Sequence, residues 1–143
     1  ATVGTTLQTL FMIKNTRVYQ GIPNQSVIFI KSLTAAARGN NNVLTTVFII
    51  RNPTIAGAPV WSEYDPNHSC TLYCGTAGLT VTTVENSRVL YSTSISESGQ
   101  IAEKFNDASE EFELQPGEVI AVCAQTSSST AYVIASMNTR EDQ

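Results

Sequence analysis

Residues 115–137 read QPGEVIAVCAQTSSSTAYVIASM and contain a turn followed by two strands. Pro116 and Gly117 occupy the second and third positions of a type II turn, because that turn needs a φ of roughly −60° and then a positive φ. The apolar runs 119–124 and 131–137 follow, separated by the Ser/Thr-rich residues 125–130. This pattern predicts two strands and indicates a β protein.

The rest of the chain shows the same alternation of short apolar runs with turn residues. Valine, isoleucine and threonine make up 41 of the 143 residues, and β-branched side chains favour strands over helices. Further strands are predicted at 7–13, 16–22, 25–33, 43–50, 60–64, 70–74, 79–84, 88–95 and 112–114. Many short strands at this spacing predict an all-β antiparallel sandwich, jelly-roll or immunoglobulin-like.

The segment 25–50 is predicted to be one long hairpin. Val27, Phe29 and Leu33 fall on one face of its first strand, and Ile28 and Ile30 fall on the other. Residues 38–42 tolerate positive φ and would make the turn. The three alanines at 35–37 are too few to stand alone as a helix, so they stay in the hairpin.

The segments that follow differ in polarity. In 88–95, Val89, Tyr91, Thr93 and Ile95 are predicted to share one face, with a wet opposite face. Residues 97–111 hold much of the acid of the chain without a strand pattern. They are predicted to be a loop with a helical turn at 101–105.

The chain length suits a single domain over residues 1–143, with residues 1–14 as an arm or a swapped strand. Leu7, Leu10, Phe11 and Ile13 would make a poor exposed edge, so this segment is expected to cross to a neighbour. No apolar run reaches the 18 or so residues of a membrane span, so no membrane partner is expected. The 8 basic residues are scattered among 12 acidic ones, which disfavours nucleic acid as a partner.

The cysteines are expected to be structural. One group of residues has the side chains that zinc prefers, an imidazole and thiolates: His68, Cys70 and Cys74, with Cys123 far downstream. In one strand, however, Cys70 and Cys74 would lie roughly 13 Å apart, too far for one ion or for a disulfide. A bridge between strands is the alternative. The odd count and the small residue at position 1 favour three reduced thiols in a chain made in the cytoplasm, with no metal and no cofactor.

The sequence contains few residues of the types that carry out catalysis. The chain is therefore expected not to be an enzyme, and no catalytic residue is assigned. His68 is the only histidine, and no nucleophile elbow occurs. Paired carboxylates could act on glycosides, and the candidates are Glu97, Glu103, Asp107, Glu110, Glu111, Glu113 and Glu118. A solvated acidic loop is the preferred interpretation, because none of them lies in an apolar strand.

Two kinds of binding surface are compatible with the sequence. Trp61, Tyr64 and Tyr73 could form a platform for a glycan or a partner, although core aromatics are the simpler interpretation. Serine and threonine make up 32 residues, and few charges interrupt them. Such neutral strand faces suit packing against protein neighbours, because little charge has to be desolvated.

The stretches 87–95, 112–122 and 131–137 resemble the C-terminal half of small β-sandwich virion structural proteins of tailed bacteriophages. Those proteins decorate heads or belong to tail fibres. The resemblance implies a non-enzymatic, usually trimeric component with no functional residues to carry over. We therefore expect a capsid decoration or cement protein, made in the host cytoplasm and located in the virion. Its partners would be two further copies and the major capsid protein or another virion protein. A receptor- or glycan-binding domain of a tail fibre is the alternative.

Overall fold

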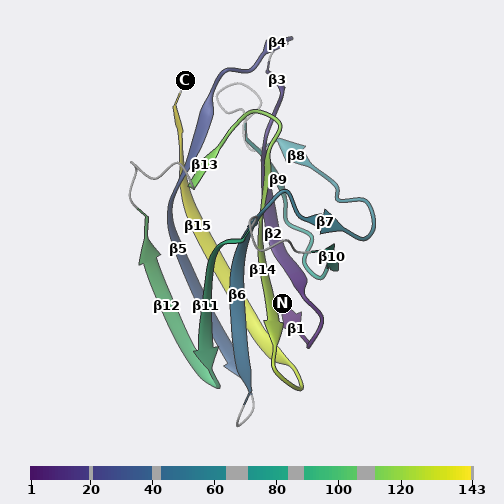
Figure 1. The fold of residues 1–143 in the computed structure, drawn as a ribbon, viewed down its shortest axis with the longest axis vertical. Helices are drawn as coiled ribbons and strands as arrows, with labels where there is room; N and C mark the ends of the chain where they lie inside the picture. The colour runs from purple at the N-terminus through teal and green to yellow at the C-terminus, as the bar shows by residue number, and fades with distance from the viewer. Residues whose placement is uncertain (20, 40–42, 64–70, 84–88, 106–111, 143) are drawn as a thin grey trace.

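The computed structural model describes residues 1–19, 21–39, 43–63, 71–83, 89–105 and 112–142, and within them it is almost entirely β (Figure 1). Two antiparallel sheets pack against each other. Sheet A has the strand order β1-β15-β5-β12, with β13 also paired to β5, and sheet B has the order β11-β6-β14-β2-β9-β8. The predicted all-β sandwich is confirmed. Within the described residues, no helix is long and apolar enough to cross a membrane.

The strands of sheet A are β1 (Thr2–Val3), β5 (Val27–Gly39), β12 (Ser98–Lys104), β13 (Glu113–Leu114) and β15 (Ala131–Asp142). Those of sheet B are β2 (Gln8–Asn15), β6 (Leu44–Arg51), β8 (Ser62–Glu63), β9 (Thr71–Cys74), β11 (Val89–Ser96) and β14 (Val119–Thr126). Two small ribbons pair β3 (Val18–Tyr19) with β4 (Ile22–Pro23), and β7 (Thr54–Ile55) with β10 (Val81–Thr83).

The inner strand β14 shows why the run 119–124 is apolar throughout. Ile120, Val122 and Ala124 belong to the main core between the sheets, whereas Ala121 and Cys123 belong to a second apolar cluster on the other side of sheet B. All five are fully buried. A strand that is covered on both faces cannot alternate apolar with polar residues.

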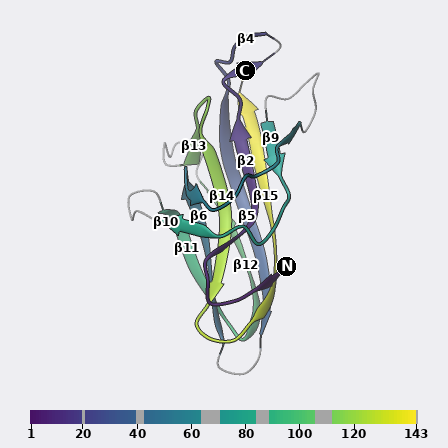
Figure 2. The ribbon, with the colours of Figure 1, turned by 90° about the vertical axis from the view of Figure 1, so that its right-hand side faces the viewer.

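The second cluster makes part of the molecule three layers thick. Cys74, Met12, Ala121 and Ile50 follow one another in register across β9, β2, β14 and β6, and Val81 of β10 packs against them. Figure 2 shows β10 on the side of sheet B that faces away from β15. The β7–β10 ribbon therefore covers the outer face of sheet B with apolar side chains.

The prediction of a long hairpin over 25–50 is wrong. β5 pairs with β15, β12 and β13 of sheet A, whereas β6 pairs with β11 and β14 of sheet B. The two consecutive strands thus lie in opposite sheets. The physical reason is that both strands carry a buried face, and these faces meet across the core instead of lying side by side.

A β-bulge also corrects the predicted faces of β5. Ser32 pairs with Asn138 and Ile30 pairs with Thr139, so Lys31 is an extra residue on β5. The extra residue reverses the side to which the next residues point. Leu33 is consequently buried on the same side as Ile28 and Ile30, and not with Val27 and Phe29.

Two further expectations change at the other edge of the sandwich. Residues 98–104 form strand β12 on the edge of sheet A, so the predicted loop with a helical turn at 101–105 is wrong. In β11, Ile95 faces the main core as predicted, but a bulge between Val89 and Tyr91 turns Val89 toward the second cluster. Edge strands are exposed, and for that reason β12 carries no apolar signature.

The N-terminal segment lies inside the sandwich of its own chain. β2 runs between β14 and β9 as an inner strand of sheet B, and β1 pairs with the start of β15. That residues 1–14 exchange with a neighbouring copy as an arm or swapped strand stays a prediction. The strand predicted over 16–22 is corrected, because β3 and β4 form a hairpin at the end of the molecule (Figure 1).

The turn at residues 115–118 is confirmed. The amide of Glu118 donates a hydrogen bond of 3.0 Å to the carbonyl oxygen of Gln115, and Gly117 has a φ of 88°. A Cβ on Gly117 would lie 2.6 Å from Nε of Arg17, so the exposed Arg17 side chain would have to shift to accommodate it. The turn thus packs against the chain that leads into the β3–β4 hairpin.

Candidate functional site

One open surface built from regular strands is the side of sheet A that points away from the core, which we call the A face. Side chains alternate along each strand, and residues paired across strands share a side. The A face therefore follows from the register of β15, β5 and β12. Among the side chains that the structure describes, its members are Tyr132, Ile134, Ser136, Asn138 and Arg140 of β15, Val27, Phe29, Ser32, Thr34, Ala36 and Arg38 of β5, and Ser98, Gln100, Ala102 and Lys104 of β12.

The chemistry of the A face is mostly neutral. Tyr132 and Ile134 are 58% and 55% exposed and are the large apolar side chains that β15 presents on this face. Asn138 and Ser32 are joined across β15 and β5 by a hydrogen bond of 3.1 Å. Arg38, Lys104 and Arg140 are the charged residues among the described side chains of this face, and the guanidinium of Arg140 lies 4.9 Å from the ring centroid of Phe29.

Trp61 and Tyr73 do not form a shared platform. Trp61 packs against the second apolar cluster on the outer side of sheet B, and Nζ of Lys14 lies 5.8 Å from its ring centroid. Tyr73 pairs with Ile13, a residue of the main core, so it points toward the opposite side of the sheet. Tyr64, the third member of the predicted platform, lies outside the described residues.

The predicted metal-like set is only partly described, because His68 and Cys70 lie outside the described residues. Cys74 and Cys123 are buried and free. Strand β2 lies between them: Cys74 pairs with Met12, Met12 pairs with Ala121, and Cys123 is two residues further along β14. By the spacings of a sheet, this separates the two cysteines by roughly 11 Å. That separation exceeds the roughly 7 Å that a disulfide spans between Cα atoms. No cluster of three or more metal-ligating side chains occurs among the described residues.

The Cys123 thiol predicts a loss of stability at high pH. Burial raises its pKa from an ordinary value of 9.0 to about 12, because the apolar surroundings disfavour the thiolate. Between these two values the unfolded chain ionises and the native chain does not. The free energy of unfolding is therefore expected to fall by about 1.4 kcal/mol per pH unit through this group, while below pH 9 the group has no effect.

Urea unfolding of the wild-type chain and of Cys123→Ala, at pH 7, 9, 10 and 11, measures this loss. Tyrosine and lysine titrations are common to both chains, so the difference between the two curves isolates the thiol. We expect the two curves to converge as the pH rises above 9. Parallel curves would show that the Cys123 thiol reaches solvent in the native state.

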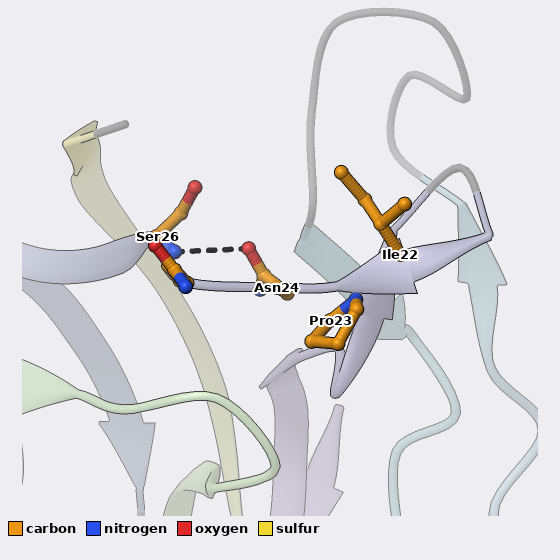
Figure 3. Close-up of a pocket in the computed structure, with 5 residues that line it drawn as sticks. Ile22, Pro23, Asn24 and Ser26 are labelled. Atoms are coloured by element: carbon orange, nitrogen blue, oxygen red, sulfur yellow. Dashed lines mark hydrogen bonds between the residues drawn. The ribbon is translucent and has the colours of Figure 1, made fainter.

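A hollow at one end of the molecule is lined by the residues 22–26 (Figure 3). Asn24 is one of the lining residues, and its Oδ1 accepts a hydrogen bond of 2.9 Å from the Ser26 amide. The Asn24 side-chain amide also donates to Oδ1 of Asn15 at 2.6 Å, and Asn15 in turn donates to the carbonyl oxygens of Ser26 and Leu114 at 2.8 and 2.9 Å. The side chains of Asn15 and Asn24 are thus paired with each other and with the backbone, and they stabilise this end of the molecule.

The sequence indicated neutral strand faces but not which strands would carry them. The A face could be located only once the partners of β5 and the bulge at Lys31 were known. No family model, no curated protein and no solved structure matches the chain.

Proposed function

We propose that the chain is a non-enzymatic structural protein of a bacteriophage virion that decorates or cements the capsid shell. The observation that carries the proposal is the A face. It is a regular, open strand surface with small neutral side chains in its middle and two exposed apolar side chains, Tyr132 and Ile134, near one end. Such a surface loses little hydration energy when a protein covers it.

The other described parts of the molecule favour a structural role over a catalytic one. Sheet strands of 13 and 12 residues, β5 and β15, run side by side along the molecule. Ion pairing is local, as between Nε of Arg51 and Oε2 of Glu118 at 3.7 Å. A glycan-binding role has less support, because Trp61 and Tyr73 lie on opposite sides of sheet B.

The proposal includes assembly. We propose a homotrimer that is made in the host cytoplasm and joins the major capsid protein or another virion protein. Cyclic symmetry uses two different patches of each copy and closes the ring without leaving an open interface. A chain of 15.4 kDa would then have an assembly mass of about 46 kDa in solution.

Three measurements test this function. Mass spectrometry of purified particles is expected to find the chain in the virion, and electron microscopy is expected to place it on the outside of the capsid shell. Sedimentation of the purified protein is expected to give the trimer mass. Absence from the particle, or a location only on the tail, would contradict the cement role, and a monomer mass would contradict the trimer.

A further inference from the structure

We infer that the open edge of strand β15 in one copy pairs with the open edge of strand β11 in the next copy, so that backbone hydrogen bonds join the subunits. The inference rests on the proposed trimer and adds to it the two strands that make the contact. Three features carry it: the unpaired backbone groups at both edges, the uncharged side chains of both strands, and the directions in which the strands run.

The edge of β15 is covered by another strand at one end only. The amide of Val133 donates a hydrogen bond of 2.8 Å to the carbonyl oxygen of Ala1, and the Ala1 amine donates one of 2.8 Å back to Val133. Backbone groups alternate in direction along a strand, so those of Ala135, Met137 and Thr139 point to the same side. The bulge does not interrupt this alternation, because its extra residue lies on β5. Among the described residues, no hydrogen bond reaches these groups.

The inner side of β15 is also incompletely covered beyond β1. Val133, beside Ala1, is fully buried, whereas Ala135 and Met137 pack against the main core and are only half-buried. A further strand beside them would continue the cover that β1 provides. It would also supply partners for the open backbone groups, since an unpaired strand edge is a template for another strand.

The edge of β11 is open in the same way, because β11 pairs with β6 on one side only. The amide of Glu97, directly after β11, donates a hydrogen bond of 2.8 Å to the carbonyl oxygen of Val43, directly before β6. By the same alternation, the backbone groups of Ser92, Ser94 and Ser96 point away from β6. The three serines are exposed, and within the part of the chain that the structure describes their outward backbone groups form no hydrogen bond.

The two edges lack the charges that keep edge strands apart. Residues 131–139 of β15 and 89–96 of β11 contain no charged side chain. The edge strand β12 differs, because Glu103 pairs with the core residue Leu33 and so places a charge on the inward side, and Lys104 follows it. Inward-pointing charges and lysines prevent pairing at the edges of natural sheets. The sequence thus blocks pairing at β12 and permits it at β15 and β11.

A second copy is the occupant that these edges favour, because it brings β11 to β15 and leaves neither edge of the ring open. β15 and β11 lie at opposite sides of the sandwich and run in opposite directions (Figure 1). A ring needs two different patches of this kind on each copy. Rotation about an axis along the strands preserves their directions, so β11 of one copy meets β15 of the next antiparallel. Antiparallel pairs are slightly more stable than parallel ones.

Amide hydrogen exchange of the wild-type trimer, followed residue by residue by NMR, reads this pairing directly. The reference is the amide of Ala102 on β12, which points away from its sheet because residues 97 and 105 form the hydrogen bonds with β5. The amides of Ala135, Met137, Ser92 and Ser94 are expected to exchange at least about a hundredfold more slowly than that of Ala102. Exchange as fast as that of Ala102 at either edge would overturn the inference.

Proline substitutions test the same contact. A proline removes a backbone N–H, and its ring blocks a neighbouring strand. At an outward-pointing position it leaves the hydrogen bonds within the sheet intact. Ala135→Pro and Ser92→Pro lie on the two proposed edges, and Ala102→Pro is the matched control on β12. Circular dichroism checks that the variants fold, and for a variant that does not fold the exchange measurement on the wild type decides.

Wild type and Ala102→Pro are expected to sediment as trimers, and the mass of Ala135→Pro and Ser92→Pro is expected to fall about threefold, to that of the monomer. A trimer in either edge variant would overturn the inference and leave the proposed trimer standing. Loss of the trimer in Ala102→Pro would place β12 in the contact and would also overturn it. A wild type that is not a trimer would contradict the proposed assembly together with the inference, whereas the location in the virion is tested separately on particles.

Discussion

A chain that lacks residues 1–14 is expected not to fold. The deletion removes β1 and almost all of β2, and with them the buried side chains of Val3, Leu10, Met12 and Ile13. Each contributes about 1.5–3 kcal/mol, so their sum is of the order of the whole net stability of a domain, about 5–15 kcal/mol. In addition, β14 and β9 would lose the strand that lies between them.

Circular dichroism and amide NMR spectra of the truncated chain measure this outcome. A shorter deletion of residues 1–6 serves as the control, because it removes β1 and leaves β2 in place. That chain is expected to fold with a lower melting temperature. If the chain without residues 1–14 instead folds cooperatively and sediments as a smaller species, the segment is an exchangeable arm, as the sequence alone indicated.

The substitution Asn15→Leu is expected to destabilise the chain by about 3–6 kcal/mol. Asn15 is fully buried, and leucine has a similar shape but no polar atom. The carbonyl oxygens of Ser26 and Leu114 would lose their donor, and the side-chain amide of Asn24 would lose an acceptor. Each buried polar group left without a partner costs about 1–3 kcal/mol.

Chemical denaturation of Asn15→Leu measures this cost, and Asn138→Leu is the matched control. Asn138 also lies in a strand and donates a side-chain hydrogen bond, to Oγ of Ser32, but it is exposed to water. Its replacement is expected to change stability by no more than about 0.5 kcal/mol. Equal losses for the two variants would mean that the buried network around Asn15 has no special role.

Local patterns predicted several elements of this fold correctly. The turn at 115–118 follows from the chemistry of Pro116 and Gly117, which needs no knowledge of the rest of the chain. Strands β14 and β15 follow from their apolar runs. The sandwich itself follows from composition and from the number of short strands.

Partners and registers could not be read from the same patterns. The periodicity of β5 and β6 reports that each is a strand, but not that the two lie in opposite sheets. The bulge at Lys31 leaves no mark in the sequence, and it reverses the side to which Leu33 points. β12 was missed because an exposed edge strand can be polar along its whole length.

The candidate sites depended on those registers. Trp61 and Tyr73 are near each other in the sequence, but the pairing of β9 with β2 puts them on opposite sides of sheet B. The strands predicted over 7–13 and 16–22 leave Asn15 between them, whereas Asn15 ends β2 and is fully buried. The A face combines residues from 27 to 140, and only long-range pairing brings them together.

The pairing of the first strand with the last has a consequence for how the chain matures. Thr2 lies beside Tyr132, and the terminal amine of Ala1 donates a hydrogen bond of 2.8 Å to the carbonyl oxygen of Val133. β5 likewise has no neighbour in its sheet before residues 98–104 have been synthesised. Sheet A therefore cannot be completed before residues 131–142 have been synthesised. Folding dominated by such distant pairings is slow, on the order of milliseconds to seconds, so newly made chains spend that interval with their apolar strand faces uncovered.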